Sequence, residues 1–382
     1  MAIDLDSAFD AFEASTDLTV GLEEEFALLD PSSLDLVDGY EKLKAAAEED
    51  EVLVDSVAGE LISSEVEIRS GRGETLNDAL ERQREHRRRL FNLAAEHGVG
   101  LGATGTHPWA DYREQRIIDT DHYRRLERDL QAVARRNNPF SRHVHVGVRG
   151  ADRAVEVCDR LRPLAPLLLA LSANSPYLDG RDAGLHSART QIFTKSFPRC
   201  GIPDHYGSWA AYRDYIDLLL RTRSIVEYTQ LWWSLRPHFG FGTVEVRICD
   251  AQTTAAESDA LAGLIVACVA QAARDADERR PLVEQPRRLI EENLWRALRY
   301  GRDGRLVDFA AARELEAGEA LEGLLAWCAP VRDELGLELS LPELNGAQRQ
   351  RRLIESGADA AEVYAVSVRE TRESYAAEAV LE

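Results

Sequence analysis

The sequence is poor in several residue types, and some of these shortages exclude a class of protein. Only three of its 382 residues are lysine (Lys42, Lys44 and Lys195), so nearly all of the basic charge is carried by arginine. Acidic residues outnumber basic ones by 67 to 46, which gives a formal net charge of −21. A surface this acidic argues against nucleic acid or an anionic membrane as a partner.

Cysteine and long apolar runs are also scarce. The five cysteines are scattered without C-x-x-C spacing, which excludes a disulfide framework or a thiolate zinc site as the first interpretation. The longest apolar stretch, residues 261–270, is too short to span a bilayer. The first residues lack the basic and apolar regions of a signal peptide. We therefore expect a cytoplasmic protein that does not bind membranes.

No linker divides the chain. Its length alone would suggest two or three domains, but the sequence contains no low-complexity run and no tract rich in proline, glycine and serine. Hydrophobic residues make up 45% of the sequence, enough for a substantial core. We predict one domain over residues 1–382, with a sheet core at about 15–253 and a helical C-terminal part at about 254–382.

Three separated segments read as strands with one polar and one apolar face. They are residues 19–26, 143–148 and 243–248. Because strand side chains alternate between faces, three pairs should each project together, namely Glu23 with Glu25, His143 with His145, and Glu245 with Arg247. The aliphatic residues between them point to a core. A sheet face lined with carboxylates, imidazoles and arginine is costly unless the charges bind ligands, so this face is the predicted active site.

The remaining pattern predicts an α+β fold. Helices are expected at about 7–17, 40–49, 74–97, 123–136, 151–172 and 209–226, and from 254 to the end. Further strands are expected at 52–57, within 60–70 and at 99–105, with 228–235 paired to 242–250. Residues 180–208 show no clear periodicity and predict a functional loop. Hairpin-like strand pairs among helices indicate an antiparallel sheet with helices covering the face opposite the polar one.

Two glutamates, Glu60 and Glu24, need a special environment. Glu65, Glu67 and Arg69 share one face of their strand, whereas Glu60 has the opposite parity. Glu60 joins the same site only if it projects from the preceding loop or across a bulge. Glu24 shares the apolar face of its strand, so it must form a salt bridge, lie at a sheet end or be rotated out by a bulge.

The polar residues suit cations and phosphate. Carboxylates at positions i and i+2 of a strand lie roughly 7 Å apart and bracket hard cations, and H-x-H aims two imidazoles into one space. Without thiolates, this donor set favours Mg²⁺ or Mn²⁺ over zinc. Arg247 is a natural clamp for a phosphate or carboxylate, although a structural salt bridge is the competing interpretation. There is no P-loop, so a nucleotide would be held mainly by cations and arginines.

Taken in order, these segments resemble a known enzyme family. They are GLEEEF, the E-x6-E at Glu60 and Glu67, GTHP, HVHVGV, LSANSPY, SARTQIF with FPRCGIP, and WWSLRPHFGFGTVEVRICDAQT. From Gly21 to about Thr254 the chain is similar to the glutamate–cysteine ligase type 2 family. These carboxylate–amine ligases are relatives of glutamine synthetase in fold. The helical C-terminal third carries a weaker signal.

The resemblance implies a polar sheet face that binds ATP and two or more Mg²⁺ ions, with Mn²⁺ as the alternative ion. It implies that Arg247 contacts phosphate, that His145 lies beside the nucleotide and that Arg189 helps to hold the acid substrate. The implied metal ligands are Glu23, Glu25, Glu60, Glu67, His143 and Glu245. The implied reaction joins the γ-carboxylate of glutamate to the amine of cysteine through an acyl phosphate. The partners would be these small molecules, and a homodimer is a possible assembly.

Three alternatives stay open. The amine substrate could differ from cysteine, because the family includes members whose amine substrate is unknown. The chain could be a metal-dependent hydrolase that uses His143, His145 and the carboxylates, although it has neither a D-x-H nor an H-x-x-E-H pattern. It could also be a nucleotide-sensing protein that has lost turnover, but the intact set of carboxylates and Arg247 argues against this.

Overall fold

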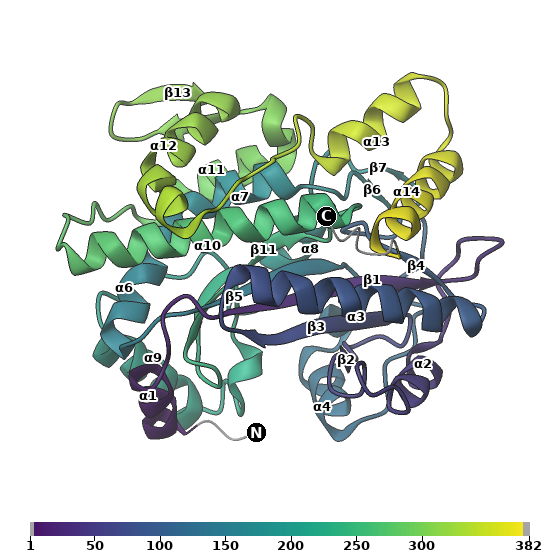
Figure 1. Ribbon diagram of the computed structural model, residues 1–382, viewed down its shortest axis with the longest axis horizontal. Helices are drawn as coiled ribbons and strands as arrows, with labels where there is room; N and C mark the ends of the chain where they lie inside the picture. The colour runs from purple at the N-terminus through teal and green to yellow at the C-terminus, as the bar shows by residue number, and fades with distance from the viewer. Residues whose placement is uncertain (1–3, 377–382) are drawn as a thin grey trace.

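A seven-stranded antiparallel sheet forms the centre of the protein, which a computed structural model describes over residues 4–376 (Figure 1). The strand order is β10-β11-β5-β1-β3-β2, and β4 pairs with the far end of β1. The strands are β1 (Val20–Leu29), β2 (Val57–Ala58), β3 (Glu65–Gly73), β4 (Gly100–Gly102), β5 (Ser141–Gly147), β10 (Leu235–His238) and β11 (Thr243–Asp250). The three strands predicted to carry a polar face, β1, β5 and β11, thus lie side by side in one sheet.

The register of the sheet aligns the polar positions in rows. On β1, Glu23 lies opposite His143 of β5 and Arg69 of β3, and Glu25 lies opposite Glu67 of β3. Two further pairs extend the same face, His145 with Glu245 and Glu245 with Arg236 of β10. Because facing residues of an antiparallel pair have their Cβ atoms about 4.5–5.5 Å apart, this register brings side chains from five strands together.

Helices cover the opposite, apolar face of the sheet (Figure 1). They are α3 (Leu76–Glu96), α6 (Ala151–Leu161), α7 (Ala165–Ser172), α10 (Ala255–Asp277) and α14 (Ala360–Tyr375). Val20, Leu22, Val144, Val146 and Val244 project to this side and are at most 1% exposed. The predicted fold class is therefore confirmed: a mixed α+β fold in which helices pack behind an antiparallel sheet.

Helix α10 is the central helix of this layer. Thr254 and Glu257 form a capping box that begins it, and its run of small and aliphatic residues lets it pack against β5, α6, α12 and α14. At 23 residues it is longer than the apolar stretch recognised in the sequence, and by length and composition alone it could cross a membrane. However, 78% of its most apolar window is buried within the protein, as expected for a core helix.

The other elements lie around this centre. A second layer packs on α7 and α10 and contains α11 (Arg287–Tyr300), β12 (Arg305–Asp308), β13 (Arg313–Glu316) and α12 (Ala317–Leu335). Helix α13 (Gly346–Glu355) packs against α14. The remaining helices are α1 (Leu5–Glu13), α2 (Tyr40–Ala47), α4 (Asp121–Leu130), α5 (Ala132–Arg135), α8 (Ala188–Ser196) and α9 (Trp209–Arg221). Short pieces are η1 (Arg162–Leu164), β6 (Tyr177–Leu178), β7 (Arg181–Asp182), β8 (Cys200–Gly201), η2 (Tyr228–Gln230), β9 (Trp232–Trp233) and η3 (Gly301–Asp303).

Three strand predictions were wrong in extent. Of the strand expected at 99–105, only Gly100–Gly102 forms β4. Residues 52–57 mostly form turns, because the Asp50 carboxylate accepts hydrogen bonds from the backbone N–H groups of Val52 and Leu53; only Val57 and Ala58 extend into β2. The strand paired with β11 is Leu235–His238 rather than 228–235. The earlier residues form η2, where a capping box between Glu227 and Gln230 turns the chain, and the short β9.

Two further predictions missed local structure. The irregular segment 180–208 contains α8, which Ser187 caps by accepting a hydrogen bond from the Thr190 N–H. The C-terminal part is interrupted by the β12–β13 hairpin, and its residues 377–382 lie outside the described residues. The division of residues 1–382 into one domain with the stated boundaries stays a prediction.

Glu24 makes the salt bridge that its apolar surroundings require. Its carboxylate accepts bidentate hydrogen bonds from Arg87 of α3, at 2.6 Å from Nε and 2.7 Å from Nη2. Arg142 of β5 lies 3.9 Å away, and Ser258 of α10 donates to the same carboxylate at 2.5 Å. The buried Arg87 and Arg142 hold the pKa of Glu24 at about 2, although burial itself favours the neutral form. This network anchors β1 directly behind Glu23 and Glu25.

Candidate active site

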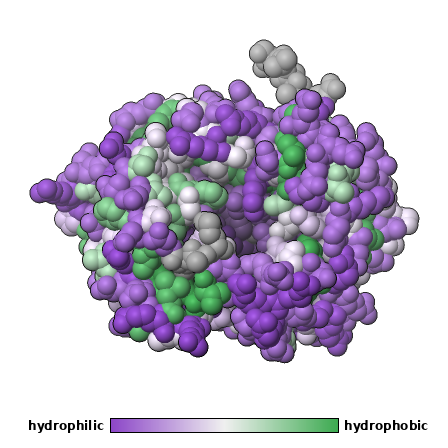
Figure 2. All heavy atoms as spheres, turned by 90° about the horizontal axis from the view of Figure 1, so that it is seen from below, coloured by the Kyte–Doolittle hydropathy of each residue, from purple (hydrophilic) through white to green (hydrophobic). Residues whose placement is uncertain are grey.

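A cavity of about 370 Å³ opens on the polar face of the sheet. Figure 2 shows this side of the molecule, hollowed at its centre and hydrophilic within. The sheet forms the floor, α4 forms one wall, and α8 with the segment from Tyr228 to Phe241 forms another. All of the site residues predicted from the sequence line it: Glu23, Glu25, Glu60, Glu67, His143, His145, Arg189, Glu245 and Arg247.

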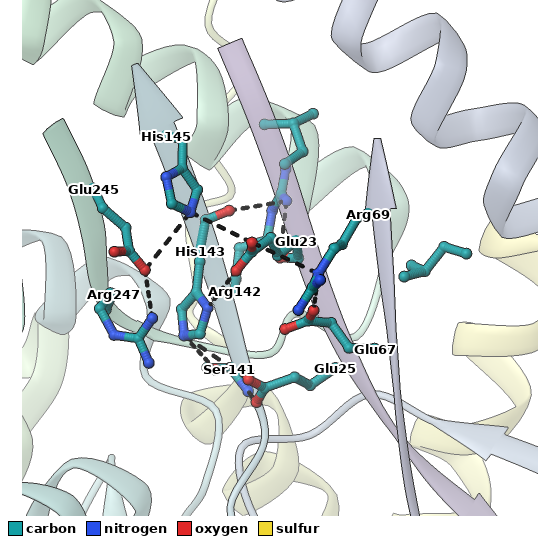
Figure 3. Close-up of polar contacts among 12 residues, drawn as sticks. Glu23, Glu25, Glu67, Arg69, Ser141, Arg142, His143, His145, Glu245 and Arg247 are labelled. Carbon is teal, nitrogen blue, oxygen red and sulfur yellow. Dashed lines mark hydrogen bonds and ion pairs between the residues drawn. The ribbon is translucent and has the colours of Figure 1, made fainter. Parts of the chain in front are cut away.

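The carboxylates and His143 form two overlapping groups that could each hold a metal ion. One group is Glu23, His143 and Glu245, and the other is Glu25, Glu67 and His143; within each, one ligand atom per residue lies within 4.8 Å of the others. His143 lies between them, with Nδ1 3.0 Å from Glu23 Oε2 and Nε2 3.9 Å from Glu25 Oε1 (Figure 3). Carboxylate oxygens with one imidazole are a donor set that suits Mg²⁺ or Mn²⁺.

On the β3 side of the cavity, carboxylates crowd one another. Burial, and then the Glu23 carboxylate, raise the pKa of Glu67 well above its usual range, even though Arg69 opposes the shift. Burial and the Glu25 carboxylate raise the pKa of Glu60 to about 7. Buried carboxylates close to each other hold protons unless a cation neutralises them. This crowding fits the binding of divalent cations.

On the other side, histidines and arginines favour ionised carboxylates. Burial would raise the pKa of Glu23, but His145 and His143 together hold it well below its usual range. Burial likewise opposes ionisation of Glu245, but Arg236 and Arg247 hold its pKa well below normal. Burial and Arg247 lower the pKa of His143, which keeps its imidazole neutral, the form that binds metals.

Glu245 is held between two arginines, and only one of them was predicted. Arg247 contacts Glu245 Oε1 on the same strand, and Arg236 Nε of β10 lies 2.5 Å from Oε2 (Figure 3). Arg236 was overlooked because the expected strand ended at residue 235. The alternation of Leu235, Arg236, Pro237 and His238 could have revealed it, since Arg236 and His238 share a face. Arg247 thus has the structural partner considered in the competing interpretation, yet its side chain is 18% exposed toward the cavity.

Arg189 lies in the cavity wall and is tied to β11. Its guanidinium donates to the backbone carbonyls of Ile248 and Arg247, both at 3.1 Å, and lies 3.7 Å from Asp250. Its Nε has no hydrogen-bond partner among the described residues. Asp250 also accepts hydrogen bonds from Ser175 and Ser187 at 2.6 and 2.9 Å, which joins three segments that the sequence singled out.

His145 lies beside a group of aromatic rings. Its Nδ1 is 3.0 Å from Thr243 Oγ1, while Nε2 is buried without a hydrogen bond in the described structure. Its ring packs edge-on against His238 and Phe241, which stack with their centroids 4.4 Å apart. Phe241 is 63% exposed at the edge of the cavity.

Glu60 reaches the site from the loop between β2 and β3. Its side chain therefore faces the cavity although its position has the opposite parity to Glu67. Tyr123 of α4 donates a hydrogen bond to the Gly59 carbonyl at 2.7 Å and so fastens this loop. Two other basic residues near the end of α8 do not line the cavity. They are Lys195 and Arg199, and the Arg199 side chain donates to the Gln230 carbonyl and packs on Trp232.

Solved structures share the fold. The structure matches glutamate–cysteine ligase from Francisella tularensis, solved in complex with AMP, with a TM-score of 0.66 and 12% identity, covering 95% of this chain and 91% of that one. It also matches a bifunctional glutathione synthetase from Pasteurella multocida with a TM-score of 0.65 and 11% identity, covering 97% of this chain and 54% of the other. At such low identity these matches establish a shared fold and nothing more. The chain thus has the fold of these two enzymes.

Comparison of sequences gives the family. The model of glutamate–cysteine ligase family 2 matches residues 19–378. "Putative glutamate–cysteine ligase 2" of Solibacter usitatus is 37% identical over 361 residues, 93% of each chain. "Putative glutamate–cysteine ligase 2-2" of Rubrobacter xylanophilus is 39% identical over 346 residues, 89% of this chain and 88% of the other. The chain belongs to glutamate–cysteine ligase family 2, as the resemblance of its motifs predicted.

Proposed function

We propose that this protein is an ATP-dependent ligase that joins the γ-carboxylate of glutamate to the amine of cysteine, forming γ-glutamylcysteine. The observation that carries the proposal is the pair of overlapping ligand groups, Glu23–His143–Glu245 and Glu25–Glu67–His143, with Arg236 and Arg247 beside them. With cations held by these groups, the ions and the two arginines would place positive charge where an anionic nucleotide transfers a phosphoryl group. Family membership and the AMP complex of the Francisella protein support ATP as the nucleotide.

The residues present fit divalent cations. Glu60 and Glu67 have raised pKa values because burial and neighbouring carboxylates disfavour their charge, and His143 is held neutral. Glu23, Glu25, Glu67, His143 and Glu245 would hold the ions, with Glu60 adjoining from its loop. Bound Mg²⁺ would neutralise phosphate charge and orient the reacting oxygens.

The reaction then needs no nucleophile from the protein. The γ-carboxylate oxygen attacks the γ-phosphorus of ATP, which breaks the bond to ADP and gives an acyl phosphate. The amine attacks the acyl carbon, the bond between carbon and the phosphate oxygen breaks with its electron pair leaving on phosphate, and the protons lost by the ammonium group pass to phosphate and solvent. Arg247 and Arg236 would stabilise charge on the transferred group, and Arg189 would hold a carboxylate of glutamate. Burial raises the thiol pKa values of Cys200 and Cys249 to about 11, which disfavours a thiolate nucleophile.

The test is ADP release by the purified protein with Mg²⁺, ATP, glutamate and a panel of amines. We expect ADP to form at a rate that depends on both glutamate and amine, with cysteine preferred, and the product identified by mass spectrometry. If the protein prefers a different amine, it is still an ATP-dependent ligase, but its amine substrate is not cysteine. Phosphate release that is independent of any acid substrate would favour the hydrolase and overturn the proposal.

A further inference from the structure

One buried carboxylate beside the cavity has no part in the proposed reaction. Asp250 ends β11 and is fully buried, and it is not among the residues that line the cavity. Up to Arg247 the odd positions of β11 face the cavity, so simple alternation would turn Asp250 to the apolar side of the sheet. The register shifts between Val246 and Cys249, however. This bulge places Asp250 opposite Ser141, which lines the cavity, and so turns it to the polar side.

The Asp250 carboxylate is surrounded by donors. Its Oδ2 accepts hydrogen bonds from the Ser175 hydroxyl at 2.6 Å and from the Asn174 backbone N–H at 2.8 Å, and its Oδ1 accepts one from the Ser187 hydroxyl at 2.9 Å. The Arg189 guanidinium lies 3.7 Å from Oδ1. Burial raises the pKa of Asp250, and Arg189 together with these three hydrogen bonds opposes the rise. An ionised carboxylate can only accept hydrogen bonds, so it fixes both serine hydroxyls as donors toward itself.

Each serine hydroxyl is then free to accept a hydrogen bond from the first turn of α8. Ser175 Oγ, which donates to Asp250, accepts a hydrogen bond from the backbone N–H of Arg189 at 3.1 Å. Ser187 Oγ, the N-cap of the helix, accepts one from the backbone N–H of Thr190, also at 3.1 Å. Two N–H groups that have no partner within the helix are thus held by serines that Asp250 orients. The position of the first turn of α8 therefore depends on Asp250.

Arg189 is the cavity residue that this arrangement fixes. Its backbone is held through Ser175, and its guanidinium donates to two backbone carbonyls of β11, beside the Asp250 charge. The packing around this carboxylate is close, since a Cβ atom at Gly105 would lie 2.7 Å from Asp250 Oδ2. Four of the segments singled out in the sequence meet here, namely GTHP, LSANSPY, SARTQIF and the segment that forms β11.

We propose that Asp250 is a positioning residue for the acid substrate: through the two serines it fixes the first turn of α8 and so holds the Arg189 guanidinium ready for a substrate carboxylate. Asp250 does not face the cavity, so it acts only through Arg189 and the turn that carries it. This inference rests on the proposed function, in which Arg189 holds a carboxylate of glutamate. Because a binding group contributes most when its supporting contacts hold it in place, loosening Asp250 should weaken glutamate binding and spare the binding of ATP.

The test measures hydroxamate formation, because hydroxylamine traps an acyl phosphate as a hydroxamate and the natural amine need not be known. In Asp250→Asn the amide keeps the size of the side chain but turns a donor toward one of its partners. We expect the KM for glutamate to rise about 10- to 100-fold, the effect of a lost charge-assisted hydrogen bond. The KM for ATP and kcat should stay within about threefold of wild type, because the cation ligands and Arg247 are unchanged.

The matched control is a second buried aspartate, Asp159, which is 3% exposed and lies outside the cavity. Its carboxylate accepts hydrogen bonds from the backbone N–H groups of Tyr206 and Gly207 at 3.2 and 2.8 Å. Asp159→Asn and Asp250→Asn should both lower the melting temperature, but only Asp250→Asn should raise the KM for glutamate.

Other results contradict the inference. If Asp250→Asn lowers the melting temperature but leaves the KM for glutamate unchanged, Asp250 only stabilises the fold. If it raises the KM for ATP as much as that for glutamate, it does not act through Arg189. Should Asp250→Asn fail to fold, Ser175→Ala removes the link to the Arg189 N–H and must raise the KM for glutamate by about 3- to 10-fold, the effect of one neutral hydrogen bond; an unchanged KM overturns the inference. If wild-type protein forms no glutamate-dependent hydroxamate, the proposed function itself fails and this inference falls with it.

Discussion

The substitution Glu24→Gln tests the network that anchors the central strand behind the candidate site. Glu24 is 3% exposed and bonds to Arg87 and Ser258, with Arg142 at 3.9 Å. The amide of glutamine removes the charge that compensates the two buried arginines and turns a hydrogen-bond donor toward Arg87. Arg87 keeps its ion pair with Asp259 at 2.8 Å, whereas Arg142 loses its carboxylate partner.

Two estimates of the cost agree. The pKa of Glu24 falls from 4.5 to about 2 in the folded protein, which corresponds to about 3 kcal/mol of stability at neutral pH. Removing one member of a buried ion pair typically costs about 3–5 kcal/mol. Because the folded-state pKa is lowered, this stability is present above about pH 4.5 and is lost as the pH falls through about 2. We therefore expect Glu24→Gln to lose about 3–4 kcal/mol of unfolding free energy at pH 7.

The assay is urea denaturation at pH 7, followed by circular dichroism. The matched control is Glu85→Gln on α3, the helix that carries Arg87. The Glu85 side chain is 39% exposed and pairs with Arg88 and Arg89 at the surface, so the substitution should cost no more than about 1 kcal/mol. A loss below about 1 kcal/mol for Glu24→Gln, or a loss equal to that of the control, would refute the reasoning.

Three further predictions concern the site itself. Glu245→Gln should abolish ADP formation in Mg²⁺ and should also lower the melting temperature in chelator, because Arg236 and Arg247 stabilise the charged form of Glu245. Glu67→Gln should likewise abolish activity, but it should raise the melting temperature in chelator, because burial and the Glu23 carboxylate disfavour the charged form of Glu67. Arg247→Lys should lower kcat by about 10²-fold with little change in melting temperature, because Arg236 still pairs with Glu245; lowered stability with unchanged kcat would identify a structural salt bridge. Finally, the pKa of Glu60 is raised to about 7, so its contribution to stability is present below about pH 4.5 and lost as the pH rises through 7. The melting temperature in chelator should fall across that range, and the gain on adding Mg²⁺ should be larger at pH 8 than at pH 6; an equal gain at both would contradict the assignment.

The polar face of the sheet was predictable because strand alternation has a period of two. A strand with His143 and His145 among valines has only one orientation that buries the valines, and this fixes where both imidazoles point. The same reasoning predicted that Glu24 would need a salt bridge, a place at a sheet end or a bulge, and the first of these is found. It did not identify Arg87, because that partner is 63 residues away and depends on how α3 crosses the sheet.

The parts that could not be predicted depend on tertiary structure or on element boundaries. Glu60 reaches the cavity from a loop whose path is fixed by a hydrogen bond from Tyr123, far along the chain. Arg236 was missed because η2 and β9 displace the start of β10 by several residues. The wall that α4 forms, with Leu126 and Leu130, faces a cavity rather than a core, and sequence periodicity does not distinguish the two.

The most direct test of the central claim follows an oxygen atom from the acid substrate to phosphate. The protein is incubated with Mg²⁺, ATP, hydroxylamine and glutamate labelled with oxygen-18 in its γ-carboxylate, and the released phosphate is analysed by mass spectrometry. An acyl-phosphate route transfers one labelled oxygen to each phosphate that accompanies a hydroxamate. Phosphate that carries no label would show that water, and not the γ-carboxylate, attacks ATP in this site, and would contradict the account.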